Sequence, residues 1–154
     1  SPNLDDKLIN KYLENFIGKN NIEIKVLKNQ NHALLANSDA LIIASGTTTL
    51  EAALYNTPMV ISYKGPYLAY MIYRLIRYMK FVSLPNIIAG KEIVKEFIQN
   101  KADPDLIANE ILALLHNEVK RKEMIYELSQ IRNKLGDKIA SKEVAKIINN
   151  HLTK

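Results

Sequence analysis

The chain has 154 residues, of which 47% are hydrophobic, so it is long enough to bury one core. It has no cysteine, its three histidines lack metal-ligand spacing, and no apolar run approaches the roughly 20 residues of a membrane-spanning helix, so we expect no disulfide, metal, cofactor or membrane span. The net charge of +5 is modest, and without zinc-finger spacing, an RRM signature or an Arg-rich run it argues against a nucleic-acid partner.

The first quarter of the chain predicts helix, strand and helix in turn. An apolar stripe at helical spacing runs from Leu4 and ends at Gly18, which predicts a helix. Ile22 to Leu27 alternates apolar and charged residues, the pattern of a half-buried strand, and Asn31 to Asn37 reads as a short helix. Leu41 to Ala44 is wholly apolar, as strands inside parallel sheets are.

A turn of small residues joins this strand to a predicted helix, Thr47 to Tyr55. The first N–H groups of a helix have no internal partner, and the helix dipole places roughly half a positive charge there. Gly46 lets the backbone approach a ligand closely, and hydroxyls add hydrogen-bond donors at Ser45, Thr47, Thr48 and Thr49. The turn therefore predicts a phosphate site.

Glu51 lies four residues beyond Thr47, on the same helical face. A phosphate would repel its carboxylate, but an attached sugar can donate hydroxyl hydrogen bonds to it, which suggests a nucleotide or a sugar phosphate. Alternatively, Ser45 simply caps an ordinary helix and the threonines are surface residues. A strand led by Pro58, Met59 to Tyr63, follows and predicts a βαβ sheet, whose ligands bind at the carboxyl ends of the strands. The Ser45 turn lies at such an end, which favours the phosphate interpretation.

One segment, Ala52 to Lys91, supplies the whole positive charge. It contains five basic residues and no Asp or Glu, and 16 acidic residues balance the other 16 of the 21 basic ones. Five of the eight tyrosines fall between Tyr63 and Tyr78. Read as a helix, this part has an apolar stripe opposite a face of Tyr and Arg, as in helices that lie on an anionic membrane or bind a phosphorylated amphiphile. Alternatively, the stripe packs into the core and the tyrosines line a groove or a subunit contact.

The rest of the chain predicts a loop and then helices. Pro85-Asn86 argues for a loop over Val82 to Gly90, where the Asn86 amide can donate to and accept from a base or phosphate, or simply form a turn. Asp103-Pro104 starts a helix, and further helices are expected at about 118–135 and 141–152. We therefore expect one domain, with an α/β part over residues 1–99 and a helical tail over 100–154.

Three ordered motifs carry a resemblance to a known family. A-S-G-T-T-T-L-E-A-A-L is followed by P-M-V-I-S-Y-K and then by F-V-S-L-P-N-I-I-A-G-K-E-I-V-K-E-F-I-Q. The sequence resembles the C-terminal half of the lipid A disaccharide synthase family, in which A-S-G-T-x-x-L-E, P-M-V-x-x-Y and S-L-P-N-x-x-A-G follow in this order. The resemblance covers nearly the whole chain and is strongest from Leu41 to Gln99.

The resemblance implies an α/β fold, the Rossmann-like C-terminal half of a GT-B glycosyltransferase, with a truncated parallel sheet flanked by helices. It implies transfer from UDP-2,3-diacylglucosamine to 2,3-diacylglucosamine 1-phosphate, which gives lipid A disaccharide 1-phosphate and UDP. By similarity, the pyrophosphate meets Ser45, Gly46, Thr47 and Thr48, the ribose meets Glu51, and the uracil side or the diphosphate meets Asn86. Contact with the membrane or the acyl substrate is expected from Tyr67, Tyr70, Arg74 and Arg77.

The departures from the family pattern matter equally. Family members are more than twice as long, and this sequence has no counterpart of their acceptor-binding N-terminal half, with its general base, or of their Gly-Ser-Arg turn. Thr48 stands where relatives often carry Ala. We expect an inactive donor-side fragment that binds UDP weakly or not at all and whose partners are the acceptor domain, the anionic inner face of the bacterial inner membrane and further copies of the chain. The alternatives are another UDP-sugar transferase or epimerase, and a non-catalytic oligomerisation module.

Overall fold

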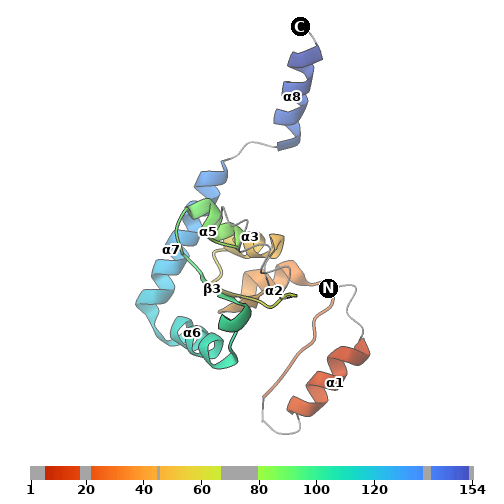
Figure 1. Cartoon of the computed structure of the whole chain (residues 1–154), viewed down its shortest axis with the longest axis vertical. Helices are drawn as coiled ribbons and strands as arrows, with labels where there is room; N and C mark the ends of the chain where they lie inside the picture. The colour runs from red at the N-terminus through yellow and green to blue at the C-terminus, as the bar shows by residue number, and fades with distance from the viewer. Residues whose placement is uncertain (1–5, 18–21, 45, 67–79, 137–139, 153–154) are drawn as a thin grey trace. The chain divides into compact units, whose positions relative to one another are not determined.

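A computed structural model of the chain describes residues 6–17, 22–44, 46–66, 80–136 and 140–152 (Figure 1). These residues belong to two compact units, Ser1–Asn37 and Ser38–Lys154. Each unit is considered by itself. None of the helices in the described ranges is both long and apolar enough to cross a membrane.

The first unit contains two helices, α1 (Asp6–Ile17) and α2 (Asn31–Asn37), both where the sequence predicts them. The strand predicted at Ile22 to Leu27 is not formed: this stretch has no regular secondary structure and all its residues are exposed. Alternation specifies one face to bury, but a strand also needs a neighbour that satisfies its N–H and C=O groups. No described strand pairs with this stretch, so the prediction was wrong.

The second unit is built on a parallel sheet in the order β1-β2-β3. Its strands are β1 (Leu41–Ile43), β2 (Met59–Tyr63) and β3 (Lys95–Ile98), and the register aligns Ile43 with Ile61 and Ile61 with Glu96. The first three residues of β2 have no exposed surface. The sequence predicted β1 and β2, whereas β3 escaped prediction because K-E-F-I is short and half charged.

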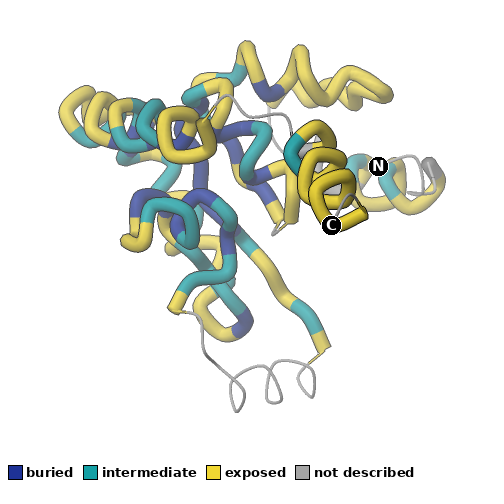
Figure 2. Tube along the Cα trace, turned by 90° about the horizontal axis from the view of Figure 1, so that it is seen from above, coloured by how far each residue is buried: buried dark blue, intermediate teal, exposed yellow. Residues whose placement is uncertain are grey.

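Helices cover this sheet. The helices α3 (Thr47–Leu54), α5 (Leu84–Ala89) and α7 (Glu118–Leu135) contact one another, and α6 (Pro104–His116) contacts both β2 and α7. The helix α5 forms where a loop was predicted over Val82 to Gly90. That prediction was wrong because Pro85 lies in the first turn of the helix, where its missing N–H breaks no internal bond. Most of the buried residues, dark blue in Figure 2, lie on β1, β2 and the helices α3, α5, α6 and α7, whereas none of the four residues of β3 is buried. The α/β class with a parallel sheet flanked by helices is therefore confirmed.

The helical second half follows its sequence signals. The Asp103 side chain accepts from the N–H groups of Asp105 and Leu106 at 3.0 and 3.2 Å, which caps α6 as predicted. A short 3-10 helix, η1 (Gln99–Lys101), links β3 to it. The last helix, α8 (Ala140–Leu152), also forms close to its predicted bounds.

Gln99, at the end of β3, has an unusual backbone conformation for a residue with a side chain. Its φ is 53°, and its side chain is buried, donating from Nε2 to the carbonyl oxygen of Gly65 at 3.1 Å. This hydrogen bond joins the segment that follows β2 to the residue that follows β3. A strained residue that is buried and hydrogen-bonded in this way is held by its surroundings.

Core packing along α7 gives a first testable prediction. Leu128 on this helix is fully buried, whereas Leu135 near its end is 44% exposed. We expect Leu128→Ala to lower the free energy of unfolding by about 2–5 kcal/mol, because it leaves a cavity, and Leu135→Ala to lower it by less than about 1 kcal/mol. Urea unfolding followed by circular dichroism measures both, and equal losses would contradict the packing described.

Candidate functional site

The start of α3 is open to solvent. The N-cap residue is Gly46, whose φ of 140° and ψ of −169° suit glycine alone, and no side chain caps the helix. Gly46, Thr47 and Thr48 are exposed, and the first turn contains no acidic residue. The positive end of this helix dipole therefore faces solvent without a covering carboxylate from its own first turn, as an anion-binding helix end requires.

Thr49 differs from its two threonine neighbours. It is fully buried, and its hydroxyl donates to the Gly46 carbonyl oxygen at 2.7 Å while its N–H donates to the same oxygen at 3.2 Å. The prediction that the Thr49 hydroxyl donates to a ligand was wrong, because this hydroxyl donates to the Gly46 carbonyl oxygen within the turn. Thr49 instead fixes the shape of the turn that presents Thr47 and Thr48.

Glu51 lies one turn along α3 from Thr47 and is partly exposed. Among the described residues, no side chain forms an ion pair or hydrogen bond with its carboxylate. A carboxylate in this state can accept hydrogen bonds from the hydroxyls of a bound sugar.

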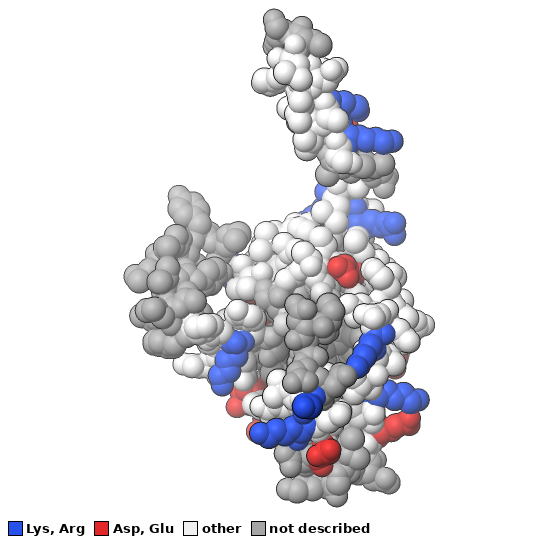
Figure 3. All heavy atoms as spheres, turned by 90° about the vertical axis from the view of Figure 1, so that its right-hand side faces the viewer, with Lys and Arg blue, Asp and Glu red and all other residues white. Residues whose placement is uncertain are grey.

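Five of the predicted site residues lie outside the described residues: Ser45, Tyr67, Tyr70, Arg74 and Arg77. Their roles stay predictions. Of the basic residues in the acid-free segment, Lys64, Lys80 and Lys91 are described and all are exposed. On the face seen in Figure 3, the described Lys and Arg side chains are scattered and do not gather into one basic patch.

Asn86 lies at a different kind of position from the open helix end. It has no exposed surface, and its Nδ2 donates to the Val94 carbonyl oxygen at 2.8 Å and to Glu96 Oε1 at 2.9 Å. Its Oδ1 accepts from the N–H groups of Ile93 and Val94 at 2.7 and 3.0 Å. Because these bonds use both amide hydrogens and both lone pairs, they favour a structural role. Direct contact with a nucleotide stays a prediction.

Glu96 is a prominent polar residue that the sequence analysis did not single out. Its carboxylate accepts from the N–H of Val82 at 2.9 Å, and from the N–H and the hydroxyl of Ser83 at 2.9 and 2.7 Å. Ser83 is the N-cap residue of α5, but its side chain makes no capping bond. No local pattern signals this cluster, because its bonds join residues 10 to 14 positions apart.

The sheet aligns the end of β1 with Glu96, the residue that holds the start of α5. Ile43, the last residue of β1, is level with Ile61, which is level with Glu96. The chain leaves β1 directly into the Gly46 turn, while the Glu96 side chain holds the start of α5. The helices α3 and α5 are also in contact, and α3 begins just after the carboxyl end of β1. This edge of a parallel sheet is where ligands of α/β folds bind.

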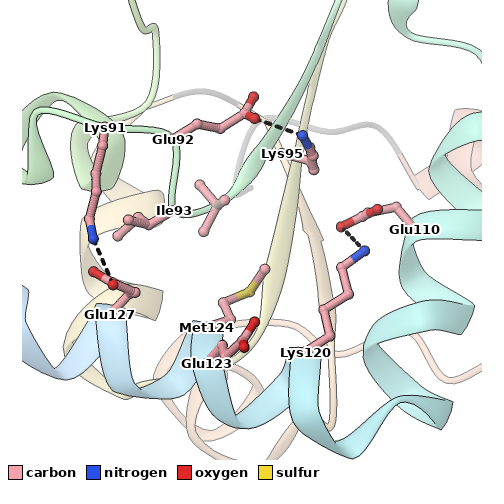
Figure 4. A pocket seen from close by; sticks show the side chains of 10 residues that line it. Lys91, Glu92, Ile93, Lys95, Glu110, Lys120, Glu123, Met124 and Glu127 are labelled. Atoms are coloured by element: carbon pink, nitrogen blue, oxygen red, sulfur yellow. Dashed lines mark hydrogen bonds and ion pairs between the residues drawn. The ribbon is translucent and has the colours of Figure 1, made fainter.

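A separate pocket of about 440 Å³ lies beside the amino end of β3, between residues 91–95, α6 and α7 (Figure 4). Its charged walls are joined in ion pairs of 2.6 to 2.7 Å: Lys91 with Glu127, Lys95 with Glu92, and Lys120 with Glu110. The hydrogen bond to Glu92 raises the pKa of Lys95 against the opposing effect of its partial burial. None of the predicted site residues lines this pocket, and no group of residues suited to a metal ion occurs in the described ranges.

Comparison with known proteins identifies the family of the chain. A family model described as lipid-A-disaccharide synthetase matches residues 4–149. The chain belongs to this family. The family membership expected from the three motifs is thereby confirmed.

Relatives of the lipid-A-disaccharide synthetase family are similar over most of this chain. The lipid-A-disaccharide synthase of Syntrophus aciditrophicus is 41% identical over 113 residues, which are 73% of this chain and 30% of the relative. That of Anaeromyxobacter dehalogenans is 34% identical over 145 residues, or 94% and 37% of the two chains. That of Rickettsia felis is 44% identical over 99 residues, or 64% and 25%. The chain therefore matches between a quarter and about two fifths of the length of these relatives.

The contrast between two adjacent threonines tests the geometry of the Gly46 turn. We expect Thr49→Val to lower the free energy of unfolding by about 1 kcal/mol, because it removes a buried hydrogen bond while keeping the side-chain shape. Thr48→Val makes the same chemical change at an exposed position and should change stability by less than about 0.5 kcal/mol. Urea unfolding measures both variants, and an equal effect would show that the Thr49 hydroxyl does not hold the turn.

Proposed function

We propose that the chain is the donor-binding part of a glycosyltransferase of lipid A biosynthesis. The reaction transfers a sugar from UDP-2,3-diacylglucosamine to 2,3-diacylglucosamine 1-phosphate and releases UDP. The observation that carries this proposal is the open start of α3, with Gly46 as N-cap and two exposed threonines at the carboxyl end of β1. Family membership supports it, because the relatives are named lipid-A-disaccharide synthases.

The pyrophosphate of the donor binds at the start of α3 in this proposal. Backbone N–H groups and the hydroxyls of Ser45, Thr47 and Thr48 donate to its oxygens, and Gly46 allows the close approach. Negative charge accumulates on the same oxygens as UDP leaves, so these groups also lower the barrier to transfer. Glu51, one helical turn away, accepts from the ribose hydroxyls.

The acid-free segment supplies contact with the lipid. Tyr67, Tyr70, Arg74 and Arg77 meet the acyl chains or the anionic headgroups, which places the protein peripherally at the inner face of the bacterial inner membrane. Both substrates are acylated anions, so a basic segment rich in tyrosine suits them.

Two further parts complete the enzyme in this proposal. An acceptor-binding half supplies the general base, since this sequence has no counterpart of that half of the family. The 154 residues alone therefore have no transferase activity and bind UDP only weakly. The apolar stripe of α8, with Val144, Ile147 and Ile148 each more than half exposed, contributes to a homo-oligomer.

Donor binding is tested by titrating the ¹⁵N-labelled chain with UDP and with inorganic pyrophosphate, because amide shifts report even weak binding. We expect both ligands to shift the amides of Gly46, Thr47 and Thr48. Glu51→Gln should weaken UDP binding about 10- to 150-fold, as loss of hydrogen bonds to a charged group does, and should not weaken pyrophosphate binding, because it removes a charge that repels phosphate. Glu123→Gln, on exposed α7 surface, is the control and should change neither affinity.

Shifts confined to other regions would contradict a donor site at α3. Equal weakening of both ligands by Glu51→Gln would show that Glu51 does not contact the ribose.

Transfer is tested by disaccharide formation with and without the acceptor-binding half of a relative added as a second chain. We expect no product from the 154 residues alone and measurable product from the pair. Product from the chain alone would overturn the proposed division of the site. Turnover of unacylated UDP-sugars with no preference for the acylated donor would favour another UDP-sugar transferase.

A further inference from the structure

The start of α5 is occupied by a side chain of the protein itself. Glu96 reaches from β3 and accepts from the N–H groups of Val82 and Ser83, from the Ser83 hydroxyl and from the Asn86 amide. A carboxylate at this end of a helix is favourable because the helix dipole is positive there. The same carboxylate repels any phosphate brought to this helix end, so the starts of α3 and α5 differ in chemistry.

The opposite end of α5 is held as well. Gly90 terminates the helix with a φ of 74°, and Lys134 Nζ donates to the carbonyl oxygens of Ile88 and Ala89 at 3.4 and 2.9 Å. A helix of only six residues is not stable in isolation. Its position therefore depends on these end contacts, with an anion at one end and a cation at the other.

The segment that Glu96 holds, from Val82 to the first turn of α5 at Asn86, is linked to the proposed donor site through the sheet and through α3. Glu96 is level with Ile61 and through it with Ile43, the last residue of β1. The helix that begins in this segment contacts α3, the helix whose start is open. A displaced segment would therefore move the helix that packs against α3.

We propose that Glu96 is a positioning residue of the donor site. It fixes the Val82 to Asn86 segment and keeps the start of α5 closed to phosphate, so that the pyrophosphate binds at α3 alone. Asn86 serves the same purpose by joining Glu96 to the backbone of Ile93 and Val94. The inference rests on the proposed function, because it assigns Glu96 a role in binding the UDP donor.

The test combines amide hydrogen exchange with the UDP titration in the 154-residue chain. Glu96→Gln keeps the side-chain shape but turns an acceptor facing the Val82 N–H into a donor. We expect exchange of the Val82 and Ser83 amides to accelerate about tenfold, exchange of the Val60 and Ile61 amides in β2 to stay unchanged, and UDP affinity to fall about fivefold.

Two other variants keep the test decisive. Ser83→Ala removes one of the hydrogen bonds to Glu96 and should accelerate exchange of the Val82 amide about threefold in a fully folded chain. Glu92→Gln is the matched control, because it makes the same chemical change at an exposed residue that pairs with Lys95. It should change neither the exchange of the Val82 and Ser83 amides nor the UDP affinity.

Each outcome decides one part of the inference. Unchanged exchange of the Val82 and Ser83 amides in Glu96→Gln would show that Glu96 does not hold this segment. Faster exchange with unchanged UDP affinity would show that Glu96 stabilises the fold but does not position the donor site. Absence of UDP shifts in the unaltered chain would overturn the proposed function and the donor-site role together, whereas exchange would still decide whether Glu96 holds the segment.

Discussion

The pairing of β2 with a parallel strand on each side is the constraint on which the second unit depends. Met59, Val60 and Ile61 have no exposed surface, so β2 is fixed by hydrogen bonds within the sheet and by packing on both faces. Its register sets the level at which β1 ends and the level at which β3 presents Glu96. The end of β1 and Glu96, which are 53 residues apart in sequence, therefore lie at the same level on either side of β2.

The starts of α3 and α5 look alike in sequence, since each follows a serine and a turn, yet they differ in chemistry. Among the described residues, no side chain caps the start of α3, and its first turn has no acidic residue, whereas the start of α5 is occupied by Glu96. The difference comes from β3, which lies beside β2 and away from β1. Sheet order thus places Glu96 on the side of β2 away from β1, the strand that leads into α3.

The sequence predicted those structural features that adjacent residues determine. Gly46 after an apolar strand, and Asp103 before Pro104, carry their structural reasons in adjacent residues, and both form as predicted. The strand at Ile22 to Leu27 failed because pairing requires a neighbour that its own sequence cannot provide. The buried bonds of Asn86 and the cluster around Glu96 could not be read from the sequence, because they join positions that only the fold brings together.

The attachment of Gly65 to Gln99 complements that of Val82 to Glu96. The two attachment points, Glu96 on β3 and Gln99 at the start of η1, are three residues apart, and they hold the two ends of one excursion of the chain, Gly65 and Val82. The entropy of closing such an excursion changes only slowly with its length. A change in the number of residues between the two attachments therefore has a small entropic cost, and the sheet can tolerate it.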